Sequence, residues 1–305
     1  MKTFQLTLLA AALVLPGANA VAAGTIYVPN AFFALPVTDF ATPSVASWEI
    51  WPPQDVGDVG VFYNSPSYAT NNPDDYIYNC DGTQAAYFYG YPGLAIFQDY
   101  DSVDSTGGPP SHAFDATYEV GKSYQLLAGM IASTLFYNLS PGDILQMSLY
   151  YRDGSSNMVT VAATNMVFTT NVFTSITNFV TCELDVPPVQ AGDAWAGRHI
   201  GIQFLSIIPT DAQPGGYWDL GNVVLTVTLA PALINPGLTN GQFGATLQSE
   251  PGLVFQILAT TNLSVPLPHW TNVVTLPNVS GTTSFLDPAT NYNQRFYQAH
   301  QLPQP

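Results

Sequence analysis

Residues 221–229 read GNVVLTVTL, and residues 157–168 read NMVTVAATNMVF. Both stretches place β-branched residues in short alternating runs, a pattern typical of strands in a sheet. Residues that favour helices, above all Glu and Lys, are scarce. Pro, Gly, Asn and Asp interrupt the chain about every ten residues, a spacing typical of a β-sandwich or barrel. The sequence therefore predicts an all-β protein.

The length of the chain favours two domains. Of its 305 residues, about 280 remain once a leader is removed, which is long for one sandwich. Residues 230–237, APALINPG, follow the first alternating stretch and contain two prolines and a glycine, a composition typical of a domain boundary. We expect a larger domain over residues 24–230, a small β-sandwich over residues 231–301 and a tail at residues 302–305.

The first residues have the features of a secretory signal peptide. Lys2 precedes an apolar run from Phe4 to Leu15, and small residues offer cleavage after Ala20 or Ala23. The run is shorter than the ~20 residues that span a hydrocarbon core. We expect a signal peptide at residues 1–23, no integral membrane span, and a secreted protein of the extracellular space or periplasm.

The charge balance excludes several classes of partner. The formal net charge is −16, and only five residues are Lys or Arg. Nucleic-acid binding needs clustered basic residues, and each basic residue contributes roughly 1 kcal/mol to binding of anionic lipid. The sequence therefore predicts neither partner. An acidic chain rich in Tyr, Asn, Thr and Gly suits uncharged polar ligands such as sugars, and oxygen-ligated cations such as calcium.

Two cysteines, Cys80 and Cys182, lie outside the leader. In an oxidising compartment an even pair favours a disulfide between them. The alternative is two buried free thiols, each behaving as a small hydrophobic side chain. The sequence leaves both states open, since it does not set the distance between the two Cα atoms.

Tyrosines gather in residues 84–91, which read QAAYFYGY. In a strand, Tyr87, Tyr89 and Tyr91 would share one face. Such a face stacks against sugar rings and offers hydroxyl groups for hydrogen bonds. The alternative is a packed sheet face whose hydroxyl groups reach the surface.

The end of the chain resembles a fibronectin-type-III-like repeat found in secreted proteins of Verrucomicrobia. The resemblance covers residues 236–301 and is carried by FQILATTNL at 255–263, WTNV at 270–273, FLDP at 285–288 and QRFY at 294–297. It implies a structural spacer without catalytic residues.

The larger domain resembles a different group. Its matching segments are VPNAFF at 28–33, DGTQAAY at 81–87, VGKSYQL at 120–126 and YWDLGNV at 217–223. They are similar, in this order, to segments of secreted galactose-binding-like or carbohydrate-binding-module-like domains, an architecture shared with the Stig cyclases. The resemblance implies a jelly-roll β-sandwich.

Several site residues follow from that resemblance. Asn30, Asp81 and Asp219 are expected as ligands of a structural calcium ion, and Trp218 is expected to contact a ligand together with the three tyrosines. Ala34 stands where the family usually carries Glu, and Gly221 where it usually carries Asp, so two carboxylates of a family-type calcium site are missing. The alternative for the acidic residues is a solvated surface that keeps the protein soluble.

The sequence leaves three functions open. No G-x-S-x-G or H-E-x-x-H motif is present, so we expect a non-catalytic protein that binds a polysaccharide or cell-surface glycan. The second function is an enzyme, a lyase, cyclase or hydrolase, with Asp219 as its acid. The third is a structural protein of the extracellular matrix. The sequence does not indicate the oligomeric state.

Overall fold

The computed structural model describes residues 24–52, 58–65, 76–105, 107–133, 139–175, 177–208, 215–288, 292 and 294–302. Within them every regular element is a β-strand except a 3-10 turn at Leu267–His269, so the all-β prediction is confirmed. None of the described segments forms a helix that is long and apolar enough to cross a membrane. The expected signal peptide, residues 1–23, lies outside the described residues.

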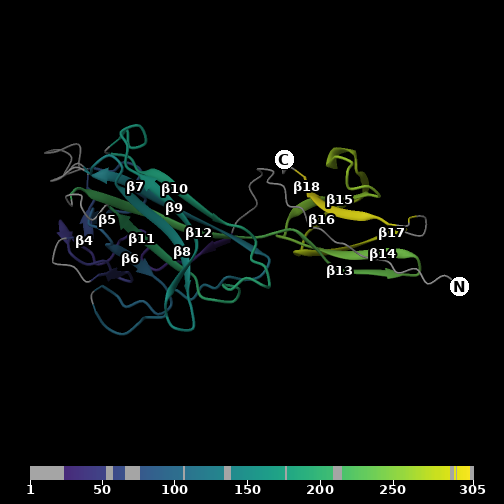
Figure 1. Ribbon diagram of the computed structural model, residues 1–305, viewed down its shortest axis with the longest axis horizontal. Coiled ribbons are helices and arrows are strands. Elements are labelled where there is room, and N and C mark those ends of the chain that lie inside the picture. Colours follow the sequence, from purple (N-terminus) through teal and green to yellow (C-terminus); the bar gives the residue numbers. More distant parts are fainter. Residues whose placement is uncertain are drawn as a thin grey trace. The chain divides into compact units, whose positions relative to one another are not determined.

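The chain divides into two compact units, Gly24–Val227 and Thr228–Pro305. The expected boundary, after residue 230, lies three residues beyond this division. Figure 1 labels the strands from β4 to β18, and each unit is described by itself below.

The first unit is a sandwich of two antiparallel sheets. The seven-stranded sheet has the order β10 (Val180–Val186), β7 (Lys122–Ser133), β12 (Tyr217–Leu229), β5 (Gln84–Tyr89), β4 (Val59–Tyr63), β2 (Ala41–Thr42), with β1 (Gly24–Ile26) also paired to β12. The five-stranded sheet has the order β3 (Glu49–Trp51), β6 (Ala95–Gln98), β11 (Gly201–Ile207), β8 (Ile144–Arg152), β9 (Met158–Val167). The two alternating stretches that predicted strands form β12 and β9.

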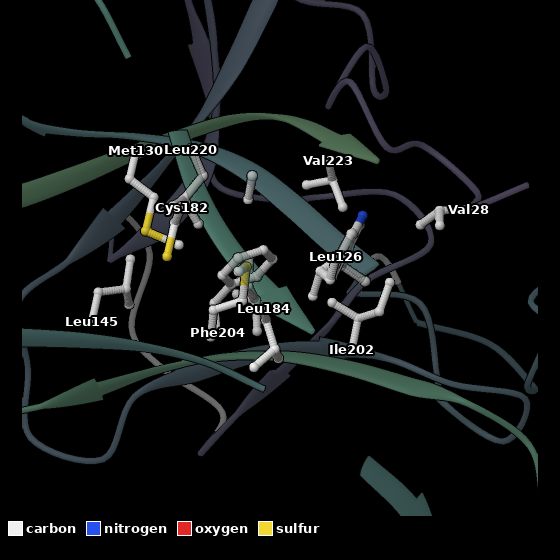
Figure 2. Close-up of a cluster of buried hydrophobic side chains, with 14 of the residues drawn as sticks. Val28, Leu126, Met130, Leu145, Cys182, Leu184, Ile202, Phe204, Leu220 and Val223 are labelled. Atoms are coloured by element: carbon white, nitrogen blue, oxygen red, sulfur yellow. The ribbon is translucent and has the colours of Figure 1, made fainter. Parts of the chain in front are cut away.

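The space between the two sheets is filled by apolar side chains. Figure 2 shows Leu126, Leu145, Leu184, Phe204 and Leu220 pointing into it. Successive side chains of a strand point to opposite faces, so every second residue joins this core. The outer face of each sheet is therefore built from the residues in between.

Of the two states that the sequence left open, the disulfide is wrong, because both cysteines are free. Cys182 points into the core between the sheets. Cys80 packs against a second cluster that includes Ala85 and Ile131. The residues next to these two in the sequence, Ala86 and Met130, fill the main core. That second cluster therefore lies on the outer face of the seven-stranded sheet. The sheet separates the two sulfur atoms.

The second unit consists of two three-stranded antiparallel sheets. Their orders are β13 (Ala232–Thr239), β14 (Gln242–Gln248), β17 (Thr282–Pro288), and β16 (Thr271–Asn278), β15 (Leu253–Thr260), β18 (Phe296–Gln301). Phe243, Leu247, Phe255, Ile257 and Phe285 form their common core. The likeness of this unit to a fibronectin-type-III-like repeat stays a prediction.

The proline-containing stretch that indicated the domain boundary is largely a strand. Residues 232–237 form most of β13, an edge strand that pairs only with β14 among the described strands. Its register shifts between Ile234 and Gly237, where Pro236 lies. Proline lacks the N–H group that donates hydrogen bonds between paired strands. A bulge in an edge strand needs no such donor, so proline is tolerated there.

Candidate functional site

Three tyrosines lie together on the outer face of the seven-stranded sheet. In the antiparallel pair β5 and β12, Tyr89 lies opposite Tyr217 and Tyr87 lies opposite Asp219. The alternate residues of both strands, such as Phe88 and Trp218, fill the core, so these four side chains point outward. We call Tyr87, Tyr89 and Tyr217 the tyrosine surface.

The rings of the tyrosine surface are in contact. The ring centroid of Tyr217 is 5.9 Å from that of Tyr87, at an interplanar angle of 75°, and 5.0 Å from that of Tyr89, at 45°. All three side chains are half-buried, and Tyr89 also packs against the core at the end of its strand. Tilted and edge-to-face contacts of this kind fix the rings in place while leaving part of each exposed.

A glycine on the next strand makes room for one of these rings. A Cβ atom at Gly60 in β4 would lie 2.6 Å from Cζ and 2.4 Å from the hydroxyl oxygen of Tyr87. The same atom would lie 2.1 Å from the carbonyl oxygen of Thr42 in β2. The Tyr87 ring therefore lies across β4 and brings its hydroxyl group towards the edge strand.

Carboxylates flank the tyrosine surface. Burial raises the pKa of Tyr87 to about 12, and Tyr217 and Asp58 add to the shift. The Tyr87 hydroxyl group is therefore a neutral donor and acceptor at any physiological pH. Asp219, on the same face, is only 8% exposed. The surface combines apolar rings with hydroxyl groups and hydrogen-bond acceptors.

An open groove lies at the β2 edge of the same sheet. It has a volume of about 700 Å³ and is lined by Pro36, Val37, Thr38, Asp39, Ala41, Thr42 and Tyr63. One wall is held by Gln84, whose Nε2 donates to the carbonyls of Phe33 and Pro36, each at 3.1 Å, and whose Oε1 accepts from Thr38 N at 2.8 Å. Thr42 links the groove to the tyrosine surface.

Two of the predicted ligand contacts do not join this site. Trp218 is fully buried, in contact with the rings of Phe168 and Phe173, so it has no surface for a ligand. Tyr91 is exposed, but β5 ends at Tyr89 and Tyr91 lies in a turn in which its N–H donates to the Tyr89 carbonyl at 2.8 Å. Tyr217 was not predicted as a site residue. It directly precedes Trp218 in an alternating strand and therefore lies on the other face of the sheet, which was a signal for it.

The predicted calcium ligands, Asn30, Asp81 and Asp219, come from three separate segments of the first unit. The amide of Asn30 is engaged on both sides, since it donates to the carbonyls of Leu35 and Ala46 and accepts from Leu35 N. Asp81 precedes β5, whereas Asp219 lies opposite the middle of that strand. The described residues contain no group of three or more His, Cys, Asp or Glu that could hold a metal ion. Calcium binding stays a prediction, which melting curves with and without excess chelator would decide.

Neither the known family models nor the curated proteins contain a match to this sequence. Solved structures with a similar fold include a cyclase from Fischerella sp. TAU, with 18% identity and a TM-score of 0.49 over 69% of this chain and 100% of that one. The tandem CBM22 domains of Paenibacillus barcinonensis Xyn10C match 94% of this chain and 93% of theirs, with 11% identity and a TM-score of 0.37. A xylan-binding module, CBM15, matches 63% of this chain and 97% of its own length, with 11% identity and a TM-score of 0.33.

Proposed function

We propose that this protein binds a neutral polysaccharide or cell-surface glycan, without catalysis, at the tyrosine surface. The observation that carries the proposal is the cluster of three half-buried tyrosine rings on an outer sheet face. Sugar rings present apolar C–H faces and a rim of hydroxyl groups. Aromatic rings with neutral hydroxyl groups match both features.

The charges of the site favour an uncharged ligand. Asp58 lies close enough to raise the pKa of Tyr87, and Asp219 shares its face. Two basic side chains of this unit pair with other acids. Lys122 Nζ contacts Glu119 at 2.8 Å, and Arg152 Nε contacts Asp99 at 2.8 Å. A uronic acid or sulfated sugar would meet carboxylates at the tyrosine surface.

The remaining features fit a secreted binding protein. The signal-peptide-like leader supports export to the extracellular space or periplasm, and the second unit would serve as a spacer. A structural calcium ion would stabilise the first unit without contacting the glycan. The oligomeric state is not part of the proposal.

Affinity electrophoresis through gels containing neutral polysaccharides tests the proposal. Tyr217→Ala should weaken retention several-fold to about tenfold, because it removes the central ring of the cluster. Tyr27→Ala removes an exposed tyrosine outside the cluster and should leave retention unchanged. Equal retention of both variants, or no retention of the wild type by any gel, would contradict the proposal.

The second candidate function is an enzyme that uses Asp219 as an acid. The observation in its favour is the burial of the Asp219 carboxyl group beside tyrosines. Asp219→Asn separates the two functions. Glycan binding predicts that the variant still binds, whereas the enzyme predicts a loss of turnover with intact folding. The third candidate, a matrix protein, predicts no glycan retention at all.

A further inference from the structure

One edge of the five-stranded sheet is a long strand with a partner on one side only. β9, Met158–Val167, pairs with β8 and with no other described strand. Its register with β8 shifts at Val161, so the strand is regular from Ala162 to Val167. An unpaired edge presents a row of N–H and C=O groups to which another strand can bond. We call Ala162–Val167 the β9 edge.

The β9 edge is open to solvent. No residue of β9 is fully buried, whereas Leu145, Met147 and Leu149 of the neighbouring strand β8 are 0% exposed. Ala162 and Met166 face the core and pack against it, but they are only half-buried. β10, the edge strand of the other sheet, lies near β9 and leaves these two side chains partly exposed. The edge therefore offers apolar surface that a further strand would bury.

A hydrogen bond at the end of β9 shows which main-chain groups point away from β8. The N–H group of Phe168 donates to the carbonyl of Asp143 at 2.7 Å, so Phe168 faces β8. Main-chain groups alternate in direction along an antiparallel strand, which turns the N–H and C=O groups of Val167, Asn165 and Ala163 away from β8. No other strand in the described part of the chain pairs with β9, so these groups are available to an incoming strand.

The other short or edge strands of the first unit are protected against pairing, and β9 is not. β1 and β3 have three residues each and β2 has two, which is too short for a stable ladder. β10 carries the exposed carboxylates of Glu183 and Asp185. β9 contains no charged residue, no proline and no glycine. A long edge without these features is an expected site of strand pairing.

The absence of charge along β9 favours a second copy of this chain as the partner. The formal net charge of the chain is −16, so two copies repel each other in general. Residues 154–182, which include β9, contain no Asp, Glu, Lys or Arg. A second copy that pairs along the β9 edge therefore meets no like charge there. A basic partner would find no carboxylate along β9 to pair with.

We infer that the β9 edge is an interface between two copies of this chain, which pair there as antiparallel strands about a two-fold axis. Asn165 lies opposite Asn165 of the partner subunit, and Ala163 lies opposite Val167 of the partner subunit. Each such pair exchanges two main-chain hydrogen bonds, and a contact between identical surfaces closes at two copies. The inference is independent of the tyrosine surface, which lies on the other sheet.

Sedimentation velocity over a series of protein concentrations tests this inference. The wild type should dimerise, and its dissociation constant should fall as added salt screens the net charge. Asn165→Lys places like charges opposite each other at the two-fold axis and should raise the dissociation constant about tenfold or more. Asn165→Asp should do the same, but an equimolar mixture of the two variants should dimerise again, because opposite charges then meet. Thr282→Lys, at an exposed position of the edge strand β17, should leave the dimer unchanged.

Ala163→Pro tests the interface without adding charge. Its N–H group points away from β8, so proline removes a donor of the interface and no hydrogen bond to β8, and melting curves check that each variant folds. A wild type that stays monomeric at its highest soluble concentration would overturn the inference. So would dimers that persist in both Asn165→Lys and Ala163→Pro, or a mixture of Asn165→Lys and Asn165→Asp that stays monomeric. Loss of the dimer in Thr282→Lys would place the interface in the second unit and also overturn it.

Discussion

The ring of Tyr87 lies over Gly60, so closely that a single methyl group at Gly60 would lie 2.4 Å from the tyrosine hydroxyl oxygen. The lack of a side chain at Gly60 leaves space for the Tyr87 ring of the tyrosine surface and also allows β2 to approach β4. Gly60→Ala should therefore destabilise the protein by about 1–3 kcal/mol, as overpacking does, and should weaken glycan retention.

Gly192 provides the matched control for that substitution. No atom lies within 4 Å of a Cβ built there, so Gly192→Ala should leave the melting temperature and retention almost unchanged. Thermal melting and affinity electrophoresis of both variants provide the measurements. A Gly60→Ala protein as stable as the wild type would show that the Tyr87 ring and β2 move apart without cost.

The Gln84 side chain should be essential for the groove. Gln84→Ala removes both hydrogen bonds to the Phe33 and Pro36 carbonyls, and leaving such groups unpaired costs about 1–3 kcal/mol. Gln125→Ala is the control, because its bonds to Glu183 and Asp185 are exposed and its effect should stay below about 0.5 kcal/mol. Urea unfolding of both variants checks the difference, and equal stability would contradict the role of Gln84.

Stability should fall at alkaline pH, in part because of Tyr87. Burial raises its pKa to about 12, whereas an unfolded tyrosine titrates near about 10. Its stabilising contribution is therefore complete below about pH 10, and is lost as the pH rises towards 12 because the unfolded state ionises first. Tyr87→Phe should show a smaller fall in the free energy of unfolding over this window. An identical fall in both proteins would assign the effect to other tyrosines.

Protein purified without reductant should contain two free thiols. Burial raises the pKa of Cys182 to about 11 and also raises that of Cys80, so both sulfurs are protonated and slow to react at neutral pH. Cys80, which is half-buried, should be alkylated before Cys182, which is buried. Mass spectrometry after timed alkylation measures the order. A cross-linked peptide containing both residues would contradict the structure.

The second unit should fold alone only when β13 is included. Leu233 of this strand packs against the core of the unit, and β13 covers one edge of β14. A fragment of residues 228–305 should give a cooperative melting transition, whereas a fragment of residues 240–305 should not. Cooperative melting of both fragments would show that β13 is dispensable.

Much of the fold could be predicted from the sequence, because strand alternation is a local property. The stretches that form β9, β12 and β15 show it within a few residues. The state of Cys80 and Cys182 could not be predicted, because it depends on which face of the sheet each residue occupies. Pro236 similarly indicated a domain boundary rather than a strand, because the sequence does not reveal that β13 lies at the edge of its sheet.

The candidate site could be predicted only in part. Tyr87 and Tyr89 follow from alternation within one strand, but Tyr217 joins them through the pairing of residues that lie far apart in the chain. Trp218 was expected from the resemblance to contact a ligand, but it fills the core, because its neighbours Tyr217 and Asp219 occupy the outer face.

Gly221 was singled out because the resembled jelly-roll domains usually carry an aspartate at this position. A Cβ atom there would lie 2.7 Å from the ring of Phe179, so an aromatic ring now fills the space that a side chain would need. Restoring the aspartate alone would collide with Phe179, and removing Phe179 alone would leave a void beside Gly129 as well. The two positions are therefore coupled, because an aspartate at Gly221 requires a smaller or displaced side chain at Phe179.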